Sequence, residues 1–136
     1  MKNYFSRISL ARGIYLLLAS IYAFCIIAQV FIAGMALFIQ PIHWIHHVNF
    51  VHYFGFNIPV LLFLLAWIGA FPRWAYWHLF GLLSLMFAMY FTANITGKLP
   101  LGAATHPLLA VLLVLLSCFH VYKVLQLNLK KMKGAH

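Results

Sequence analysis

The stretch NIPVLLFLLAWIGAFPRWAYWHLF, residues 57–80, joins two apolar runs through a turn at Phe71–Pro72–Arg73. Both runs are continuously apolar, whereas the strands of a membrane barrel would alternate apolar and polar positions. A connection this short can only join antiparallel neighbours. The stretch therefore predicts a helical hairpin that crosses a lipid bilayer twice.

The rest of the chain repeats this apolar pattern. Of its 136 residues, 66% are hydrophobic and only 7% are charged, and none is Asp or Glu, so the chain cannot build a water-exposed surface. A bilayer core about 30 Å thick needs roughly 20 apolar residues per helix. We therefore predict an all-α, up-down-up-down bundle of four membrane helices in a single domain, residues 1–136, with helices at approximately 14–38, 48–70, 74–91 and 101–124.

The formal net charge of +9 comes from basic residues that gather on one side of the predicted bundle. Arg73 lies in the hairpin turn, and most of the others precede the first run or lie at or beyond the end of the fourth. The opposite loops, 39–47 and 93–105, hold only Lys98. The positive-inside rule then places both termini and Arg73 in the cytoplasm. We expect a multi-pass protein of the inner or plasma membrane that contacts lipid and does not bind nucleic acid.

Four histidines fall into two pairs by depth. His52 and His106 each open a helix that enters from the outer face, whereas His78 and His120 lie near the cytoplasmic ends of theirs. His106 and His120, 14 residues apart, share one face of the fourth helix at a separation of roughly 21 Å. Ionisable groups at this depth normally face the bundle interior with a partner, and no carboxylate is present to pair with them. Haem iron is a candidate partner, because neutral imidazole is a standard axial ligand.

Each of two histidines precedes a glycine by three residues, in HYFG at residues 52–55 and HLFG at residues 78–81. A glycine at this spacing shares the helix face of the histidine. Gly55 and Gly81 would thus leave room for a flat macrocycle, or they would simply let two helices pack closely. The two haem propionates would find positive partners in Lys98 outside and in Arg73 or Lys123 inside.

This arrangement resembles the membrane-embedded b-type cytochromes of the four-helix-bundle kind, in which two levels of paired histidines hold haem. The resemblance implies one haem b, or two, with His52 and His106 as the outer ligands and His78 and His120 as the inner ones. In the usual pattern two helices each carry two ligands, whereas here Ala66 stands 14 residues after His52. The segments 29–34, 52–55 and 106–107 are also similar to a set of small uncharacterised four-helix bacterial membrane proteins, which implies that the outer half is the functional one.

The sequence thus favours a haem-binding protein that transfers electrons, to a redox partner protein or quinone, or that holds and hands over haem. One alternative is a non-redox accessory or scaffold subunit. Another is a copper or zinc handling protein, because His43, His46 and His47 would share one face of a helical turn on the outer side. Hydrolysis and group transfer are disfavoured, since a general acid or base pair normally needs a carboxylate. A proton-coupled transporter of the common kind is disfavoured for the same reason, since the sequence has no Asp or Glu relay.

Small and polar residues leave further alternatives open. Ala19, Ser20 and Ala23 on the first helix would permit homodimer packing and suit packing inside one bundle equally well. Gln29 and Asn57 would bond each other between helices, or line the outer site behind its ligands.

Overall fold

The computed structural model describes the backbone of residues 2–133 and the side chains of residues 7–130. These residues form helices and connections, with no strand among them. The helices are α1 (Lys2–Phe38), α2 (His43–Phe54), α3 (Asn57–Ile68), α4 (Arg73–Asn94), α5 (Pro100–Ala103) and α6 (His106–Lys133).

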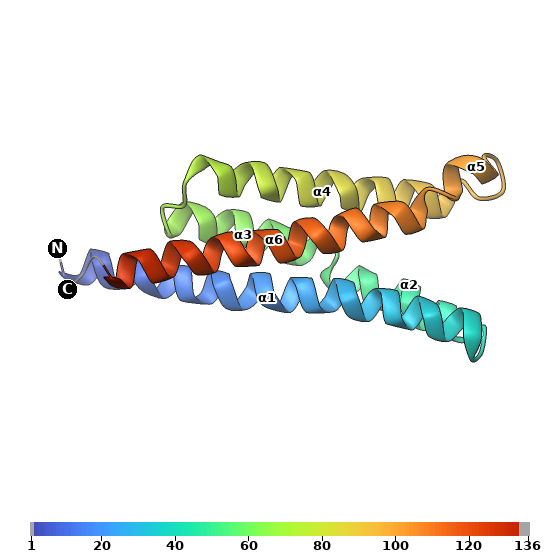
Figure 1. Ribbon diagram of the computed structural model, residues 1–136, viewed down its shortest axis with the longest axis horizontal. Helices are drawn as coiled ribbons and strands as arrows, with labels where there is room; N and C mark the ends of the chain where they lie inside the picture. Colours follow the sequence, from blue (N-terminus) through green and yellow to red (C-terminus); the bar gives the residue numbers. More distant parts are fainter. Residues whose placement is uncertain (1, 134–136) are drawn as a thin grey trace.

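Four parts of the described chain are long and apolar enough to cross a membrane: Arg7–Phe38, His43–Ile68, Arg73–Asn94 and Pro100–Lys130. They coincide with the four predicted runs, so the prediction of an all-α bundle is confirmed. Figure 1 shows them side by side with alternating directions, as an up-down-up-down topology requires. These helices indicate a multi-pass membrane protein in contact with the lipid bilayer.

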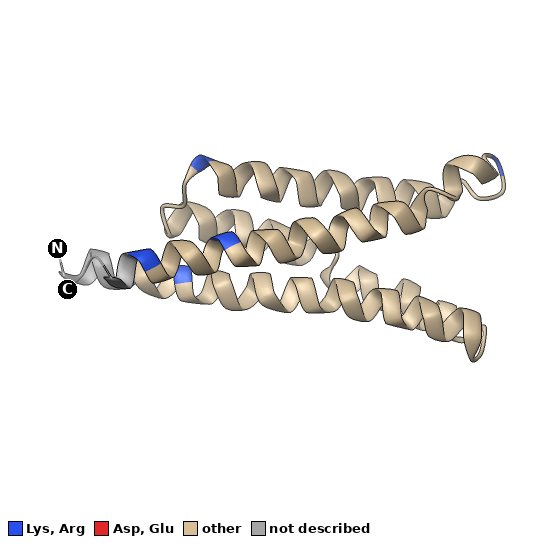
Figure 2. Cartoon of the chain, in the orientation of Figure 1, with Lys and Arg blue, Asp and Glu red and all other residues tan. Residues whose placement is uncertain are grey.

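The basic residues mark one end of this bundle. We call the end where α1 begins, α3 meets α4 and α6 finishes the inner end, and the opposite end the outer end. Figure 2 shows lysine and arginine toward the inner end, with Lys98 in the α4–α5 connection as the exception. This distribution agrees with the positive-inside rule, and the orientation in the membrane stays a prediction.

The second membrane segment differs from its prediction, because it is two helices and not one. Its helical hydrogen bonding is interrupted at Gly55–Phe56, between α2 and α3. Pro59 explains the interruption, since a proline has no N–H to donate and its ring crowds the carbonyl four residues earlier, which is that of Gly55. The Tyr22 hydroxyl of α1 donates a 3.4 Å hydrogen bond to this carbonyl oxygen instead.

The helix ends also differ from their predictions. The predicted outer loop 39–47 is mostly helical, because α2 already begins at His43. The helices α1 and α6 extend further toward the inner end than the apolar runs do, and α5 forms a short turn of helix within the predicted loop 93–105. A run of apolar residues measures the membrane-embedded part of a helix, whereas the helix itself continues to its last backbone hydrogen bond.

The bundle core lies where α1 packs against α3 and α6, and where α4 packs against the same two helices. Ala19 and Ala23 are buried in this core, so these small residues serve packing inside one bundle. Large apolar side chains cover the outside and face the surrounding lipid. Residues of the core cluster recur on α1 at intervals of three or four, as expected for one buried helix face: Tyr15, Ala19, Tyr22 and Ile26.

Arg12 ties α1 to the inner end of α3. Its Nε atom donates a 2.8 Å hydrogen bond to the Gly69 carbonyl, and its Nη2 atom donates a 2.9 Å bond to the Ala70 carbonyl. The guanidinium also lies 5.6 Å from the centre of the Phe71 ring. The carbonyls of Gly69 and Ala70, which directly follow the end of α3, thereby find their hydrogen-bond donor on α1.

Candidate functional site

Three side chains from three helices meet near the inner end, and we call them the inner cluster: Tyr15 of α1, His78 of α4 and His120 of α6. The Tyr15 hydroxyl lies 2.6 Å from Nε2 of His120. The Nδ1 atoms of His78 and His120 lie 3.2 Å apart. The structure therefore brings the predicted inner histidine pair together and adds a tyrosine to it.

The inner cluster runs from the core toward the bundle surface. Tyr15 is fully buried and His120 is 1% exposed, whereas His78 is only partly buried. The Trp74 ring lies against both imidazoles, with its centre 5.2 Å from that of His78 and 6.0 Å from that of His120. Two aromatic rings therefore shield the cluster from lipid, because Phe71 also stacks on Tyr15 at 4.1 Å.

Two of the predicted inner counter-charges lie at this end. Lys123 places its Nζ atom 5.4 Å from the centre of the Trp74 ring, so it stands beside the inner cluster. Arg73 is the exposed first residue of α4. Lys98, the predicted outer counter-charge, is exposed in the connection between α4 and α5.

A second group of polar side chains lies toward the outer end, and we call it the outer cluster: Gln29, His47, Thr92 and His106. Gln29 and His47 exchange two hydrogen bonds, because Nε2 of Gln29 donates to the His47 carbonyl at 2.6 Å and Nδ1 of His47 donates to the Gln29 carbonyl at 3.1 Å. On the other side, Nδ1 of His106 lies 2.9 Å from Oγ1 of Thr92.

The structure does not bring His52 and His106 together. The His52 side chain is exposed, and its Nδ1 atom lies 2.6 Å from the carbonyl oxygen of Val48 in its own helix. Because α2 starts at His43, His52 lies nine residues into the helix and not in its first turn. It also lies five residues after His47, which corresponds to about 140° around the helix. The histidine of α2 that faces the bundle is therefore His47.

The two glycines lie where a side chain of a neighbouring helix packs. A Cβ atom added to Gly55 would stand 3.3 Å from Sδ of Met86 and 2.8 Å from the Val51 carbonyl oxygen. A Cβ atom on Gly81 would stand 3.0 Å from Cδ2 of Leu116. Of the two functions considered for these glycines, the contacts favour close helix packing.

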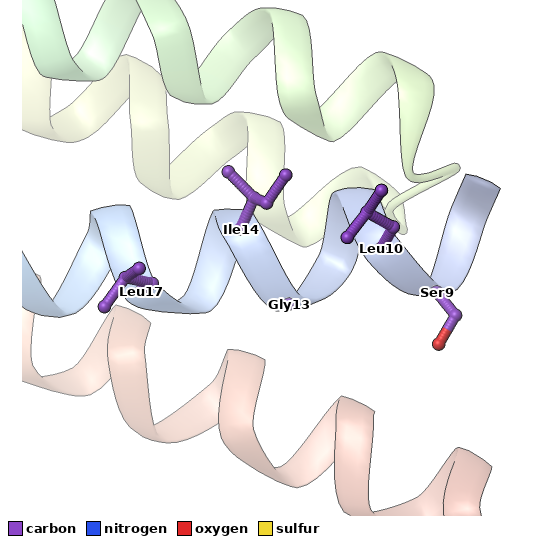
Figure 3. A pocket seen from close by; sticks show the side chains of 5 residues that line it. All are labelled: Ser9, Leu10, Gly13, Ile14 and Leu17. Carbon is purple, nitrogen blue, oxygen red and sulfur yellow. The ribbon is translucent and has the colours of Figure 1, made fainter. Parts of the chain in front are cut away.

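The inner cluster, as described, does not offer a slot for haem. A haem with two axial imidazoles holds a flat ring between them, whereas the rings of His78 and His120 are in contact, with centres 5.4 Å apart. One surface hollow lies on the outward-facing side of α1 and is lined by Ser9, Leu10, Gly13, Ile14 and Leu17 (Figure 3). No histidine lines it.

The predicted cluster of three outer-face histidines does not form. His43 and His46 have ring centres 5.6 Å apart, but His47 turns toward Gln29. Among the described residues, no three His, Cys, Asp or Glu side chains are grouped to hold a metal ion. Gln29 and Asn57 do not bond each other either, because Nδ2 of Asn57 donates to the Tyr53 carbonyl of its own chain segment at 3.0 Å.

Sequence reasoning missed Tyr15 and Tyr22, and it considered His47 only together with His43 and His46. Tyr15, Tyr22 and Gln29 are spaced by seven residues along α1, which places them on nearly one face at steps of roughly 10 Å. All three side chains are buried. A polar residue at every second turn of an otherwise apolar helix is thus the signal that would have found them.

Residues 29–97 match the model of DUF6220, a family of unknown function, over slightly more than half of the chain. The chain belongs to the DUF6220 family. No curated protein and no solved structure matches it. The part of this DUF6220 protein that matches contains Gln29, His47 and Thr92 of the outer cluster and His78 of the inner cluster, whereas Tyr15, His106 and His120 lie outside it.

Proposed function

We propose that this DUF6220 protein moves protons through its helix bundle, with the inner cluster as the relay. The observation that carries the proposal is the pair of hydrogen bonds that joins Tyr15, His120 and His78 across three helices. Imidazole and phenol groups both donate and accept hydrogen bonds, so protons can pass along such a chain. Histidine also changes its charge near neutral pH, and the sequence has no carboxylate to take that role.

Tyr15 sets the direction of these hydrogen bonds. Within the described residues its hydroxyl has one partner, His120, so the arrangement that leaves no buried donor unpaired has Tyr15 donating to Nε2 of His120. His120 then carries its proton on Nδ1 and donates it to Nδ1 of His78. His78 in turn carries its proton on Nε2.

This arrangement is ready to pass a proton from Tyr15 to His78. When a proton reaches the Tyr15 oxygen, the hydroxyl proton of Tyr15 moves to His120, the Nδ1 proton of His120 moves to His78, and the Nε2 proton of His78 leaves. One proton enters and one leaves, so the charge of the chain is restored. After this transfer, donor and acceptor are exchanged in both hydrogen bonds. Rotation of the Tyr15 hydroxyl and of the two imidazole rings restores the starting arrangement.

The buried face of α1 supplies a route from the outer half to this relay. Tyr22 lies seven residues from Tyr15, and Gln29 lies seven residues further toward the outer cluster. These steps of roughly 10 Å are too long for direct proton transfer, so the proposal requires water between the levels. Proton-conducting chains of histidine and other ionisable groups are an established use of polar residues inside membranes.

Proton flux into liposomes tests the proposal. The purified protein is reconstituted with a pH-sensitive dye inside, and a potassium diffusion potential drives protons inward. We expect flux above that of protein-free liposomes, and we expect Tyr15→Phe and His120→Gln to reduce it to the protein-free rate. The exposed His46 supplies the matched control, because His46→Gln should leave the flux unchanged. Wild-type protein that conducts no better than empty liposomes overturns the proposal.

Haem binding, for electron transfer to a redox partner or quinone or for haem handling, is our second proposal. What favours it is that α4 and α6 bring His78 and His120 to one depth among aromatic rings, with Lys123 beside them. Binding would require the two imidazoles to separate. A Soret band in protein purified from haem-replete cells, lost in His78→Ala and His120→Ala, would support it. If the protein shows neither proton flux nor a Soret band, the remaining hypothesis is a non-redox accessory or scaffold subunit of the inner or plasma membrane.

A further inference from the structure

Three basic side chains surround the α3–α4 turn, which we define as residues 69–74. Arg12 of α1 reaches this turn, because its guanidinium donates hydrogen bonds of 2.8 and 2.9 Å to two carbonyls of the turn. Lys123 of α6 also reaches it, with its Nζ atom 5.4 Å from the centre of the Trp74 ring. Arg73, the exposed first residue of α4, belongs to the turn itself. One short turn thus gathers positive charge from three helices.

No acidic side chain balances this charge. The sequence contains nine Lys and Arg residues and no Asp or Glu. Within the part of the chain that the structure describes, the Arg12 guanidinium uses two of its five N–H groups, one on Nε and one on Nη2. The contact of the Lys123 ammonium is with the face of an aromatic ring. Both side chains therefore keep N–H groups that can donate to an anion from outside the chain.

The turn lies at the depth of phospholipid headgroups. The helix α4 has 22 residues, so its length is about 33 Å, which matches a hydrocarbon core about 30 Å thick. Its first residue, Arg73, therefore lies at the boundary between hydrocarbon and headgroups. Trp77, one helical turn further along α4, is exposed, as is typical of the aromatic belt at this boundary. The hydrogen bonds of Arg12 hold its charge at the same level.

We propose that the α3–α4 turn binds the phosphate of an anionic phospholipid, with Arg12, Arg73 and Lys123 as the surrounding positive charges. A guanidinium donates to phosphate oxygens in a fixed fork, and an ammonium acts as a flexible point charge. Basic pockets between membrane helices bind lipid headgroups through the same chemistry. A lipid is favoured over a free anion, because the headgroup layer presents phosphate at this depth. The site is independent of the proposed proton relay, since it uses none of the hydrogen bonds of the inner cluster.

Native mass spectrometry of the protein in detergent tests the site. Phosphatidylglycerol and phosphatidylcholine are added together and their bound populations are compared, since both carry a phosphate but only phosphatidylglycerol has a net charge. We expect phosphatidylglycerol to be preferred by about tenfold or more, and Arg73→Gln and Lys123→Gln each to reduce this preference by about fivefold. The matched controls remove the same charge elsewhere: Lys98→Gln at the outer end and Lys130→Gln further along α6 should keep the preference.

Four results would overturn the site. The first is equal binding of the two lipids by the wild-type protein. The second is a loss in Lys130→Gln as large as that in Lys123→Gln, which would mean a diffuse attraction to the inner end. The third is displacement of phosphatidylglycerol by inorganic phosphate at the concentration of the lipid, which would assign the turn to a free anion. The fourth is an unchanged preference in Arg73→Gln, whose exposed side chain keeps the test decisive if Lys123→Gln does not fold.

Discussion

The Tyr15 hydroxyl lies 2.6 Å from Nε2 of His120, although 105 positions separate the two residues in the chain. The bond joins α1 to α6 in the most buried part of the inner half, where both side chains are almost fully removed from the surface. It is therefore the contact whose loss should be easiest to measure.

Tyr15→Phe should lower the free energy of unfolding by about 1–3 kcal/mol, because it leaves Nε2 of His120 buried without a partner. Tyr22→Phe removes the same hydroxyl from a neighbouring turn of α1, but the bond it breaks is longer, at 3.4 Å. We expect a smaller loss for Tyr22→Phe. Denaturant titration in detergent micelles measures the free energy of unfolding of both variants. An equal loss would contradict a larger contribution from the hydrogen bond between Tyr15 and His120.

The fluorescence of Trp74 should fall as the inner cluster takes up protons. Its ring lies within 6.0 Å of both imidazole centres, and a protonated imidazole quenches a neighbouring indole. The measurement uses a variant with Trp44, Trp67 and Trp77 replaced by Phe, titrated downward from about pH 8 until the fluorescence stops changing. The change should disappear when His78 and His120 are both replaced by Gln; a change that persists would come from elsewhere.

Single cysteines should place Lys98 and Arg73 on opposite sides of the membrane. In a variant with Cys25 and Cys118 replaced by Ala, Lys98→Cys should react with an impermeant maleimide added outside intact cells. Arg73→Cys should react only after the membrane is opened. The expectation rests on the gathering of basic residues at the inner end. The reverse labelling pattern would invert the inner and outer ends while leaving every contact within the bundle unchanged.

Gly81→Val should destabilise the bundle by about 1–3 kcal/mol more than Gly13→Val, because the new side chain overlaps Leu116. Gly13 is the matched control, since it is also helical and a Cβ atom added there meets nothing within 4 Å. Thermal unfolding in micelles separates the two variants. Equal stabilities would mean that α4 and α6 are free to move apart at Gly81, as a macrocycle groove would require.

The parts of the fold that the solvent dictates could be predicted from the sequence. Continuous apolar runs fix the number of membrane helices, and the short turn at Pro72 fixes their antiparallel order. The meeting of His78 and His120 followed from depth alone, because a helix rises by a constant distance per residue. The haem expected between them stays a prediction, since neither the helices nor the family match tests it.

The outer cluster could not be predicted, because it depends on the residue at which α2 begins and on two hydrogen-bonded pairs, Gln29 with His47 and Thr92 with His106. Starting α2 at His43 instead of Val48 moves His52 five residues deeper and turns His47 toward Gln29. Periodicity cannot place such a start, because helix ends are set by local hydrogen bonds. The interruption between α2 and α3 could have been predicted from the sequence, since Pro59 has no N–H to donate to the Gly55 carbonyl.

The side chains of α1 also determine the alignment of α1 with the second membrane segment, because two apolar segments could otherwise slide past each other. Arg12 donates to Gly69 and Ala70, Tyr22 donates to Gly55, and Gln29 donates to His47. The donors ascend α1 while their acceptors descend the second membrane segment, as antiparallel neighbours require. A slip of one turn would separate every donor from its acceptor at once, in a medium that offers no water as a substitute.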